Sequence, residues 1–219
     1  MRLILPLLFG LLGTGVLVWL GLWQLDRLEW KEGVLAEIEG KIVAAPVPLP
    51  ETPDASRDRF QPVTVTGTVA GETLRVLGAW REGGSGYRVI APLAVGERRI
   101  LVDLGLVPLN ASELDLPNGP IDIVGNLDWP DDVQAGTPDP DGTTWFGRDT
   151  VAMAEVLGTE PVMIVARTVV PEAGPRPLPV GTEGIPNNHL GYAIQWFGLA
   201  IVWLGMTVFL LWRMTRRTA

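Results

Sequence analysis

The chain of 219 residues has no cysteine and a single histidine, His189. Without cysteine there are no disulfide bonds, thiolate metal sites, cysteine nucleophiles or covalently attached c-type haem. One histidine cannot form the His clusters that bind zinc. The sequence also lacks a phosphate-binding glycine loop and the G-x-S-x-G motif, and its only serines are Ser56, Ser85 and Ser112. These absences disfavour a membrane-tethered hydrolase and predict a protein that is not an enzyme.

Charged side chains are missing from two long segments near the ends of the chain. Residues 3–25 contain one strongly polar side chain, Gln24, and residues 190–212 contain only Gln195. A helix of about 23 residues is roughly 34 Å long, enough to cross the hydrocarbon core of a bilayer. We therefore predict two transmembrane helices that form a hairpin. The first is interpreted as a retained anchor, because it is too long for a signal peptide and no A-x-A-like site ends it.

Acidic residues are confined to the region between these segments. That region holds all 25 Asp and Glu but 13 of the 17 Lys and Arg, and 13 positive against 25 negative charges give −12. Arg213, Arg216 and Arg217 follow the second segment, so the positive-inside rule puts both termini in the cytoplasm. Because no Arg- and Ser-rich presequence is seen, we predict a bacterial inner (cytoplasmic) membrane with a periplasmic central domain. An acidic domain argues against nucleic acid as a partner.

The region between the segments has the pattern of a β domain. Short runs rich in Val and Thr alternate with Gly- and Pro-containing turns, as is typical of antiparallel strands. A short helix is expected over residues 149–157, with Asp149 as its cap and Gly158 just beyond its end. We predict a mostly antiparallel β domain, a small barrel or sandwich, with one short helix. Its strands are expected at residues 60–69, 73–77, 87–93, 99–107, 121–127 and 161–170.

Domain boundaries follow from the same patterns. The spacing of Leu28, Leu35 and Ile38 continues the first helix beyond the apolar segment, until a Pro-rich passage begins at Pro46. Residues 171–186 hold five prolines and three glycines and are expected to form a stiff, extended tether. The predicted parts are a first transmembrane helix (1–25), a helical extension (26–45), a β-rich domain (46–170), the tether (171–186), a second transmembrane helix (187–212) and a basic tail (213–219).

The histidine stands at the threshold of the second segment, where a rigidly placed imidazole suggests a ligand site. At about 100° per residue, four side chains share one face of this helix: His189, Tyr192, Trp196 and Trp203. Ala193 and Ala200 lie between the aromatic residues and leave shallow space for a flat ring. The alternative is that the aromatic residues are ordinary interfacial side chains and that the histidine makes a helix-end or headgroup contact.

Small residues recur on the opposite face of the second helix. Such a spacing lets another helix approach closely, and the first segment carries three glycines of its own. We therefore expect the two sets of glycines to meet, so that the aromatic face points away from the hairpin, toward lipid or a partner. The glycines are Gly191, Gly198 and Gly205 on the second helix and Gly10, Gly13 and Gly21 on the first.

Two longer signatures lie in the apolar segments. Residues 187–200 read NNHLGYAIQWFGLA, and residues 21–27 read GLWQLDR and are followed by Trp30-Lys31. Both resemble the signatures of the surfeit locus family, assembly factors of haem-copper cytochrome c oxidase. The resemblance extends between them to Phe60, Gly67, Gly86-Tyr87, Pro92, Gly105, Val107-Pro108 and Trp145-Phe146. The chain departs from the family at Leu104-Gly105-Leu106, where Arg-Gly-Trp is common, so any contact made by that Arg and Trp differs here.

The resemblance implies that the protein helps haem a, as a transient cargo, to reach the catalytic subunit of the oxidase. In this interpretation His189 is the axial ligand of the haem iron, and Tyr192 and Trp196 flank the ring. Arg27 would pair with a haem propionate; its alternative is a local ion pair or a lipid phosphate. One histidine cannot supply both axial ligands within a monomer. The implied partners are cytochrome c oxidase subunit I, haem A synthase and membrane lipid. The alternative function is a haem-free membrane scaffold for oxidase subunits and haem A synthase.

Overall fold

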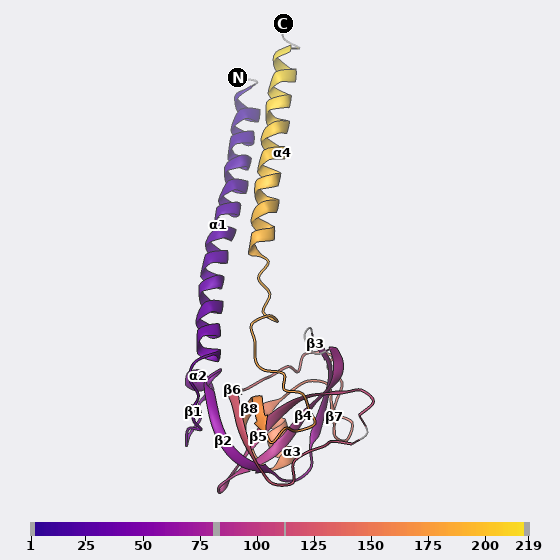
Figure 1. Cartoon of the computed structure of the whole chain (residues 1–219). Helices are drawn as coiled ribbons and strands as arrows, with labels where there is room; N and C mark the ends of the chain where they lie inside the picture. The colour runs from indigo at the N-terminus through magenta and orange to yellow at the C-terminus, as the bar shows by residue number, and fades with distance from the viewer. Residues whose placement is uncertain (1–2, 81–83, 112, 217–219) are drawn as a thin grey trace. The chain divides into compact units, whose positions relative to one another are not determined.

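The computed structural model describes residues 3–80, 84–111 and 113–216. It divides into two compact units, one that joins Met1–Glu37 to Thr182–Ala219 and one that spans Ile38–Gly181. Figure 1 labels the elements of both units. In chain order they are α1 (Ile4–Ile42), β1 (Val47–Pro48), α2 (Ala55–Asp58), β2 (Pro62–Val69), β3 (Leu74–Trp80), β4 (Gly84–Val95), β5 (Arg98–Pro108), β6 (Pro120–Asp128), β7 (Thr144–Trp145), α3 (Thr150–Leu157), β8 (Glu160–Val170) and α4 (His189–Arg216).

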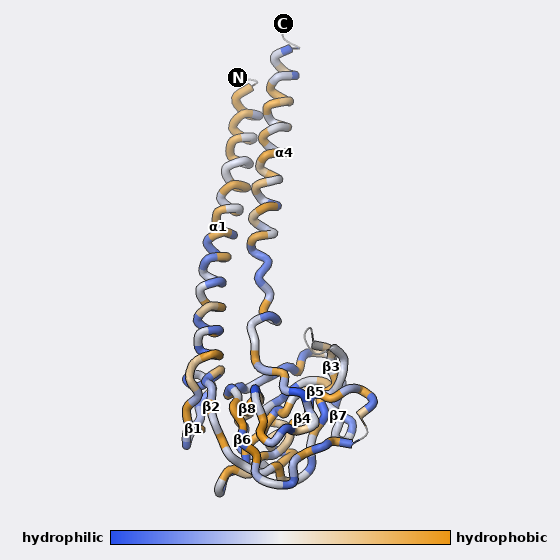
Figure 2. The backbone as a smooth tube through the Cα atoms, viewed as in Figure 1, coloured by the Kyte–Doolittle hydropathy of each residue, from blue (hydrophilic) through white to orange (hydrophobic). Residues whose placement is uncertain are grey.

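Two long helices make up the first unit, as the sequence predicts. Both α1 and α4 are long and apolar enough to cross a membrane. Figure 2 shows that hydrophobic residues predominate along the N-terminal part of α1 and along α4, and large side chains such as Leu5, Leu12 and Ile201 are exposed. A helix that is apolar on all sides is expected in lipid or in the core of a large protein. The helix α1 continues to Ile42.

The sheet of the second unit closes into a small barrel. Its strand order is β1-β2-β6-β8-β5-β4-β3-β7, with a further pairing of β2 with β4. That pairing, at Thr68↔Ala94 and Val69↔Leu93, completes a ring of strands β2-β6-β8-β5-β4. Neighbours in the ring run antiparallel except for β5 and β8, which run parallel. The predicted mostly antiparallel domain is confirmed, and of its two predicted forms the barrel is the one observed.

Alternating side chains fill the barrel, because successive residues of a strand point to opposite faces. In β2, Val63 and Val65 are buried while Thr64 and Thr66 are exposed. The helix α3 covers a second apolar cluster outside the ring, to which it contributes buried side chains including Met153. Its predicted ends are confirmed. The Asp149 carboxylate accepts hydrogen bonds from the backbone of Val151 and Ala152, and Gly158 follows in the left-handed conformation at φ 62°.

Residues 171–186, which follow β8, are the segment predicted as a stiff, extended tether, and their first part docks on the β unit. Residues 171–181 belong to the β unit. Arg176 exchanges backbone hydrogen bonds of 2.7 and 2.9 Å with Leu106 of β5. Leu178 is buried, and its carbonyl accepts a hydrogen bond of 2.8 Å from the Arg88 guanidinium. Proline and glycine content predicted an extended segment but not its contacts. The segment is held by the backbone groups of Leu106 in β5 and by the buried Arg88 guanidinium.

The Leu104-Gly105-Leu106 step lies at a bulge of β5. The register with β4 shifts there, since Val89 faces Gly105 and Ile90 faces Asp103. Leu104 is fully buried in the barrel core. Gly105 has φ +110°, and a Cβ on it would lie 2.0 Å from the carbonyl oxygen of Arg176. Glycine is therefore required where the 171–181 segment crosses β5.

Candidate functional site

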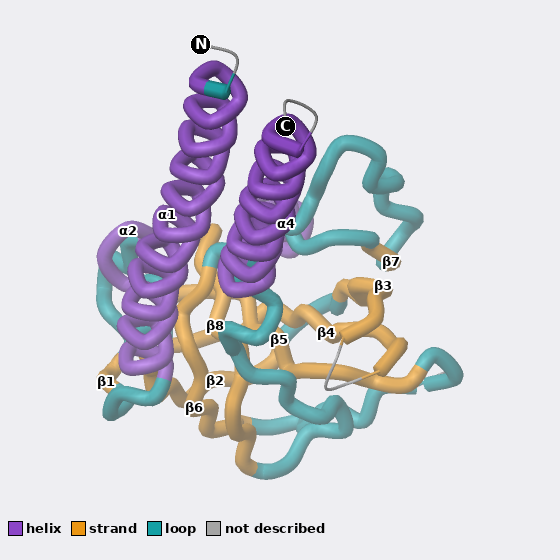
Figure 3. Tube along the Cα trace, turned by 90° about the horizontal axis from the view of Figure 1, so that it is seen from above, coloured by secondary structure: helices purple, strands orange, loops and turns teal. Residues whose placement is uncertain are grey.

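Glycines of α1 form the surface on which α4 packs, as predicted for the first helix. A Cβ placed on Gly10, Gly13 or Gly21 would come within 2.1–2.7 Å of a side chain of α4. The side chains concerned are those of Thr207, Trp203 and Phe197, respectively. Figures 1 and 3 both show α1 and α4 side by side. The missing Cβ atoms therefore allow large side chains of α4 to enter the surface of α1.

The predicted orientation of α4 is wrong. Cβ atoms on Gly191, Gly198 and Gly205 would meet nothing within 4 Å, so these glycines face away from α1. Trp203 of the aromatic face turns toward α1 instead: its ring lies 5.3 Å from that of Phe9, and its Nε1 donates to the carbonyl of Gly10 at 3.2 Å. Side chains of α4, including the Trp203 and Phe197 rings, fill the space that the missing Cβ atoms of the α1 glycines leave. Ala193 and Ala200 are buried and do not provide open space for a ring.

This orientation brings His189 against a polar side chain of α1. The His189 Nδ1 lies 2.7 Å from the Gln24 Oε1, and Gln24 is 9% exposed. An amide oxygen only accepts hydrogen bonds, so Nδ1 carries the proton and donates it to this bond. In a neutral imidazole Nε2 then holds a lone pair. Within the part of the chain that the structure describes, Nε2 has no hydrogen-bond partner.

Gln24 was not among the predicted site residues, although the sequence carries a signal for it. Steps of three and four residues connect Gly10, Gly13, Leu17, Gly21 and Gln24, which places them on one helix face. A polar side chain on the packing face of a membrane helix requires a partner there. Recognising this signal needed the correct face of α4, because the predicted orientation turned His189 away from α1.

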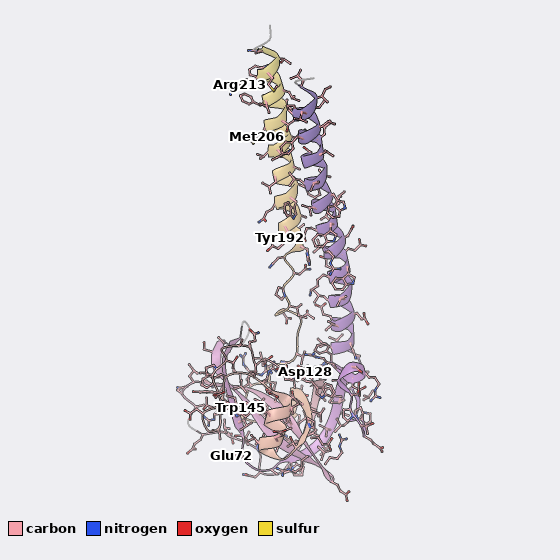
Figure 4. The ribbon with its side chains drawn as sticks, turned by 180° about the vertical axis from the view of Figure 1, so that it is seen from behind. Glu72, Asp128, Trp145, Tyr192, Met206 and Arg213 are labelled. Atoms are coloured by element: carbon pink, nitrogen blue, oxygen red, sulfur yellow. The ribbon has the colours of Figure 1, made fainter. Side chains whose placement is uncertain are left out.

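The other predicted site residues lie around the start of α4. Tyr192, which Figure 4 labels there, is 50% exposed and borders a hollow of about 390 Å³. The other residues that line this hollow are Asn187, Asn188, Gly191 and Gln195. Trp196 is half-buried. The hollow is therefore formed by the residues just before α4 and by its first two turns, next to His189 in sequence.

Arg27 lies one helical turn after Gln24 on α1 and is half-buried. Its guanidinium stands 4.2 Å from the centre of the Trp30 ring, a distance typical of a cation–π contact. Among the described residues it forms no ion pair with Asp26 or Glu29. The local ion pair considered above is therefore not the arrangement in this structure, and the charge of Arg27 is available to an anion.

The fold and the site define a protein with a hairpin of two candidate membrane helices, a polar pair at one end of the hairpin and a small β barrel between the helices in sequence. Residues 11–201 match the SURF1 family, and the chain belongs to this family. The family resemblance seen in the two apolar signatures is thereby confirmed.

Three relatives illustrate the range of similarity. Surfeit locus protein 1 of Homo sapiens is 30% identical over 209 residues, which cover 81% of this chain and 68% of the human protein. A SURF1-like protein of Monosiga brevicollis is 30% identical over 217 residues, covering 87% of this chain and 82% of that protein. The cytochrome oxidase assembly protein SHY1 of Saccharomyces cerevisiae is 28% identical over 173 residues, 68% of this chain and 43% of the yeast protein.

Proposed function

We propose that this protein takes part in the assembly of cytochrome c oxidase by binding haem a at the membrane edge and passing it to the catalytic subunit. The role is that of a carrier and not of a catalyst. Membership of the SURF1 family and the name of the yeast relative support the assembly role. The observation that supports haem binding is the His189 imidazole, which is held through Nδ1 and offers Nε2.

The chemistry of the cargo matches the surroundings of this imidazole. Haem a is a flat, apolar macrocycle with a long isoprenoid tail and two propionates, so its carrier should hold the ring at the interface and leave the tail in lipid. Neutral imidazole is a common axial ligand of haem iron. His189 is the first residue of α4, where the apolar stretch begins. The chain has no cysteine and no second histidine, so any further ligand of the iron would be water, another residue type or a side chain of a partner.

Two further contacts follow from the positions of the neighbouring residues. Tyr192 and the half-buried Trp196 lie within two turns of His189 on the same helix, and we assign them to the edges of the macrocycle. Arg27 is the cation nearest in sequence to Gln24 on α1 and has no carboxylate partner in the described part of the chain. We assign it to a propionate, since guanidinium binds carboxylates through paired hydrogen bonds.

The charge distribution sets the proposed location. Arg213 and Arg216 end α4, and the acidic residues lie between the apolar stretches. By the positive-inside rule both termini are cytoplasmic and the barrel is periplasmic, in a bacterial inner membrane. The proposed partners are cytochrome c oxidase subunit I, which receives haem a, haem A synthase, which supplies it, and the surrounding lipid.

The test is an absorption spectrum of the detergent-purified full chain, co-expressed with a haem a biosynthetic pathway, beside the variant His189→Gly. Wild type should carry haem a in stoichiometric amount, and the variant should lose it while keeping its helical circular dichroism. Free imidazole added to the variant should restore haem binding, because the glycine leaves room for the missing ligand. This rescue separates loss of a ligand from general damage to the hairpin.

The other outcomes are equally informative. Haem retained by His189→Gly would move the site to another residue. Absence of haem a from both proteins would favour the haem-free scaffold, in which the hairpin and barrel hold oxidase subunits and haem A synthase together.

A further inference from the structure

We propose that Gln24 is a positioning residue: its amide oxygen orients His189 and selects Nε2 as the atom that binds the haem iron. This inference rests on the proposed function and adds a residue to it. It starts from the only strongly polar side chain in the first apolar segment, residues 3–25. That side chain is nearly buried and lies on the face of α1 that packs against α4.

The first step concerns the cost of placing an amide in this segment. Moving an unpaired amide from water into an apolar environment is unfavourable, because the amide loses its hydrogen bonds to water. The Gln24 side chain meets the imidazole at 2.7 Å, which satisfies its oxygen within the hairpin. A leucine at this position would suit both lipid and helix packing, so packing alone does not require glutamine. The hydrogen bond with His189 is the feature that distinguishes the two residues.

The second step concerns the ligand atom. A ring held through its Cβ and its Nδ1 cannot rotate freely about χ2, and the donated proton fixes the neutral tautomer with the lone pair on Nε2. Metal-binding histidines generally use their other ring nitrogen in this way, with a carboxylate, carbonyl or water as acceptor. The Gln24 oxygen supplies that acceptor here before any metal arrives. Preorganisation lowers the entropy lost when the iron binds.

The third step concerns the strength of the iron bond. A carboxylate acceptor raises the basicity of an imidazole ligand. A neutral amide oxygen attracts the Nδ1 proton less strongly and therefore raises the basicity less. His189 paired with Gln24 is therefore a weaker donor than the same residue paired with Glu or Asp. Such a ligand suits a carrier, because the cargo must be released to another protein.

A matched control exists within the same hairpin. The described residues also contain a second interhelical hydrogen bond, from Trp203 Nε1 to the carbonyl of Gly10 at 3.2 Å. Trp203 lies 14 residues beyond His189 on α4, which is roughly 21 Å along the helix. Trp203→Phe removes this hydrogen bond and keeps an aromatic ring in place. It reports what a weakened hairpin does to haem binding without a change at the ligand.

The experiment compares full-length wild type, Gln24→Leu, Gln24→Glu and Trp203→Phe in detergent. Haem-free protein labelled with ¹⁵N-histidine is examined by NMR, where the single histidine gives an unambiguous pair of ring signals. Each protein is then titrated with ferric haem a, and the spectrum and reduction potential of the bound haem are recorded. Helical circular dichroism confirms that each variant is folded.

We expect the wild-type ring to show a protonated Nδ1 and an unprotonated Nε2. Gln24→Leu should lose this single tautomer and bind haem a about 10–100-fold more weakly, the range typical when a hydrogen-bond partner of a metal ligand is removed. Gln24→Glu should keep an affinity close to that of wild type. It should lower the reduction potential of the haem below the wild-type value, because the carboxylate makes the imidazole a stronger donor. Trp203→Phe should bind haem a as wild type does.

Two results would overturn the positioning role while leaving the proposed function intact: wild-type affinity and spectrum in Gln24→Leu, or an equal loss of affinity in Trp203→Phe. If wild type binds no haem a, or His189→Gly binds it equally well, the proposed function itself fails. The positioning role toward haem then fails with it, even if NMR shows the Gln24 hydrogen bond in the haem-free protein.

Discussion

Replacing Asp103 with asparagine should strongly destabilise the barrel. The Asp103 side chain is fully buried, and its Oδ2 accepts a hydrogen bond of 2.6 Å from Arg88 Nε. Its Oδ1 accepts from the backbone of Gly105 at 3.1 Å, and Arg148 Nη1 lies 3.6 Å from Oδ2. Asparagine has nearly the same shape but no charge. The substitution therefore leaves the Arg88 guanidinium, whose side chain is 6% exposed, without its buried counter-ion.

The magnitude follows from the burial of this pair. Breaking a buried ion pair by removing one partner costs about 3–5 kcal/mol, whereas an exposed pair contributes about 0–1 kcal/mol. Asp132→Asn is the matched control, because Asp132 pairs with Arg148 at 2.6 Å but has a side chain that is 46% exposed. The same chemical change in the same cluster should therefore cost at least threefold less free energy of unfolding.

A second variant separates charge from packing. In the double substitution Arg88→Met with Asp103→Leu both charges of the buried pair are absent, and Arg148 keeps Asp132. Replacing a whole buried pair by apolar residues of similar size is often neutral. We expect the double variant to recover most of the stability that Asp103→Asn loses. It will not recover the hydrogen bond that links Arg88 to Leu178 of the docked segment.

The assay is hydrogen exchange of the full chain in detergent, read by mass spectrometry on peptides from β5 and β8. Exchange of core strands through global opening reports the free energy of unfolding of the unit to which they belong, and the helices do not contribute to these peptides. Equal losses for Asp103→Asn and Asp132→Asn would refute the argument that burial sets the energy of this cluster.

Two further predictions concern the hairpin and the acid stability of the barrel. Gly13→Leu should loosen the hairpin by about 1–3 kcal/mol, because a Cβ at this position would meet the Trp203 ring at 2.4 Å. Gly15→Leu is the control and should be neutral, since nothing lies within 4 Å of a Cβ there. The chain has no cysteine of its own, so one cysteine engineered into each helix allows the packing to be measured by disulfide trapping, and equal trapping in both variants would contradict the prediction. Hydrogen bonds of 2.7 and 2.8 Å from Arg98 lower the pKa of the Glu160 carboxyl group. The ion pair therefore stabilises the fold fully above the pKa of an unfolded glutamate, about 4.3. This stabilisation disappears as the pH falls through the lowered pKa of the folded state. Glu160→Gln should therefore remove less than about 1 kcal/mol at pH 7 and nothing at pH 2, as measured by urea unfolding at both values; an unchanged difference between the two pH values would argue against the pair.

Much of the secondary structure was predictable because its signals are local. The apolar lengths of α1 and α4, the alternation in β2 and the capping of α3 by Asp149 all depend on residues close together in sequence. The closure of the barrel was not predictable in this way. It depends on pairing Thr68 with Ala94, and an alternating pattern shows that a strand has a buried face but not which strand lies beside it.

The candidate site shows the same division. His189 could be identified from its uniqueness and its place at the start of an apolar helix. Its partner could not be identified, because the predicted glycine contacts turned the helix the wrong way. The choice between the two faces of α4 depends on whether glycine meets glycine or an aromatic ring fills the hollow, and this is a question of volume across the interface.

By itself, the sequence determined the two candidate membrane helices, the approximate positions of the longer strands, the ends of α3 and the single histidine at the start of an apolar helix. These properties follow from composition and from periodicities of two or 3.6 residues along one segment. Tertiary structure decided the barrel closure, the docking of residues 171–181 on β5 and the contact of His189 with Gln24. Each of these depends on how side chains from distant segments fill shared space, and no single segment encodes that fit.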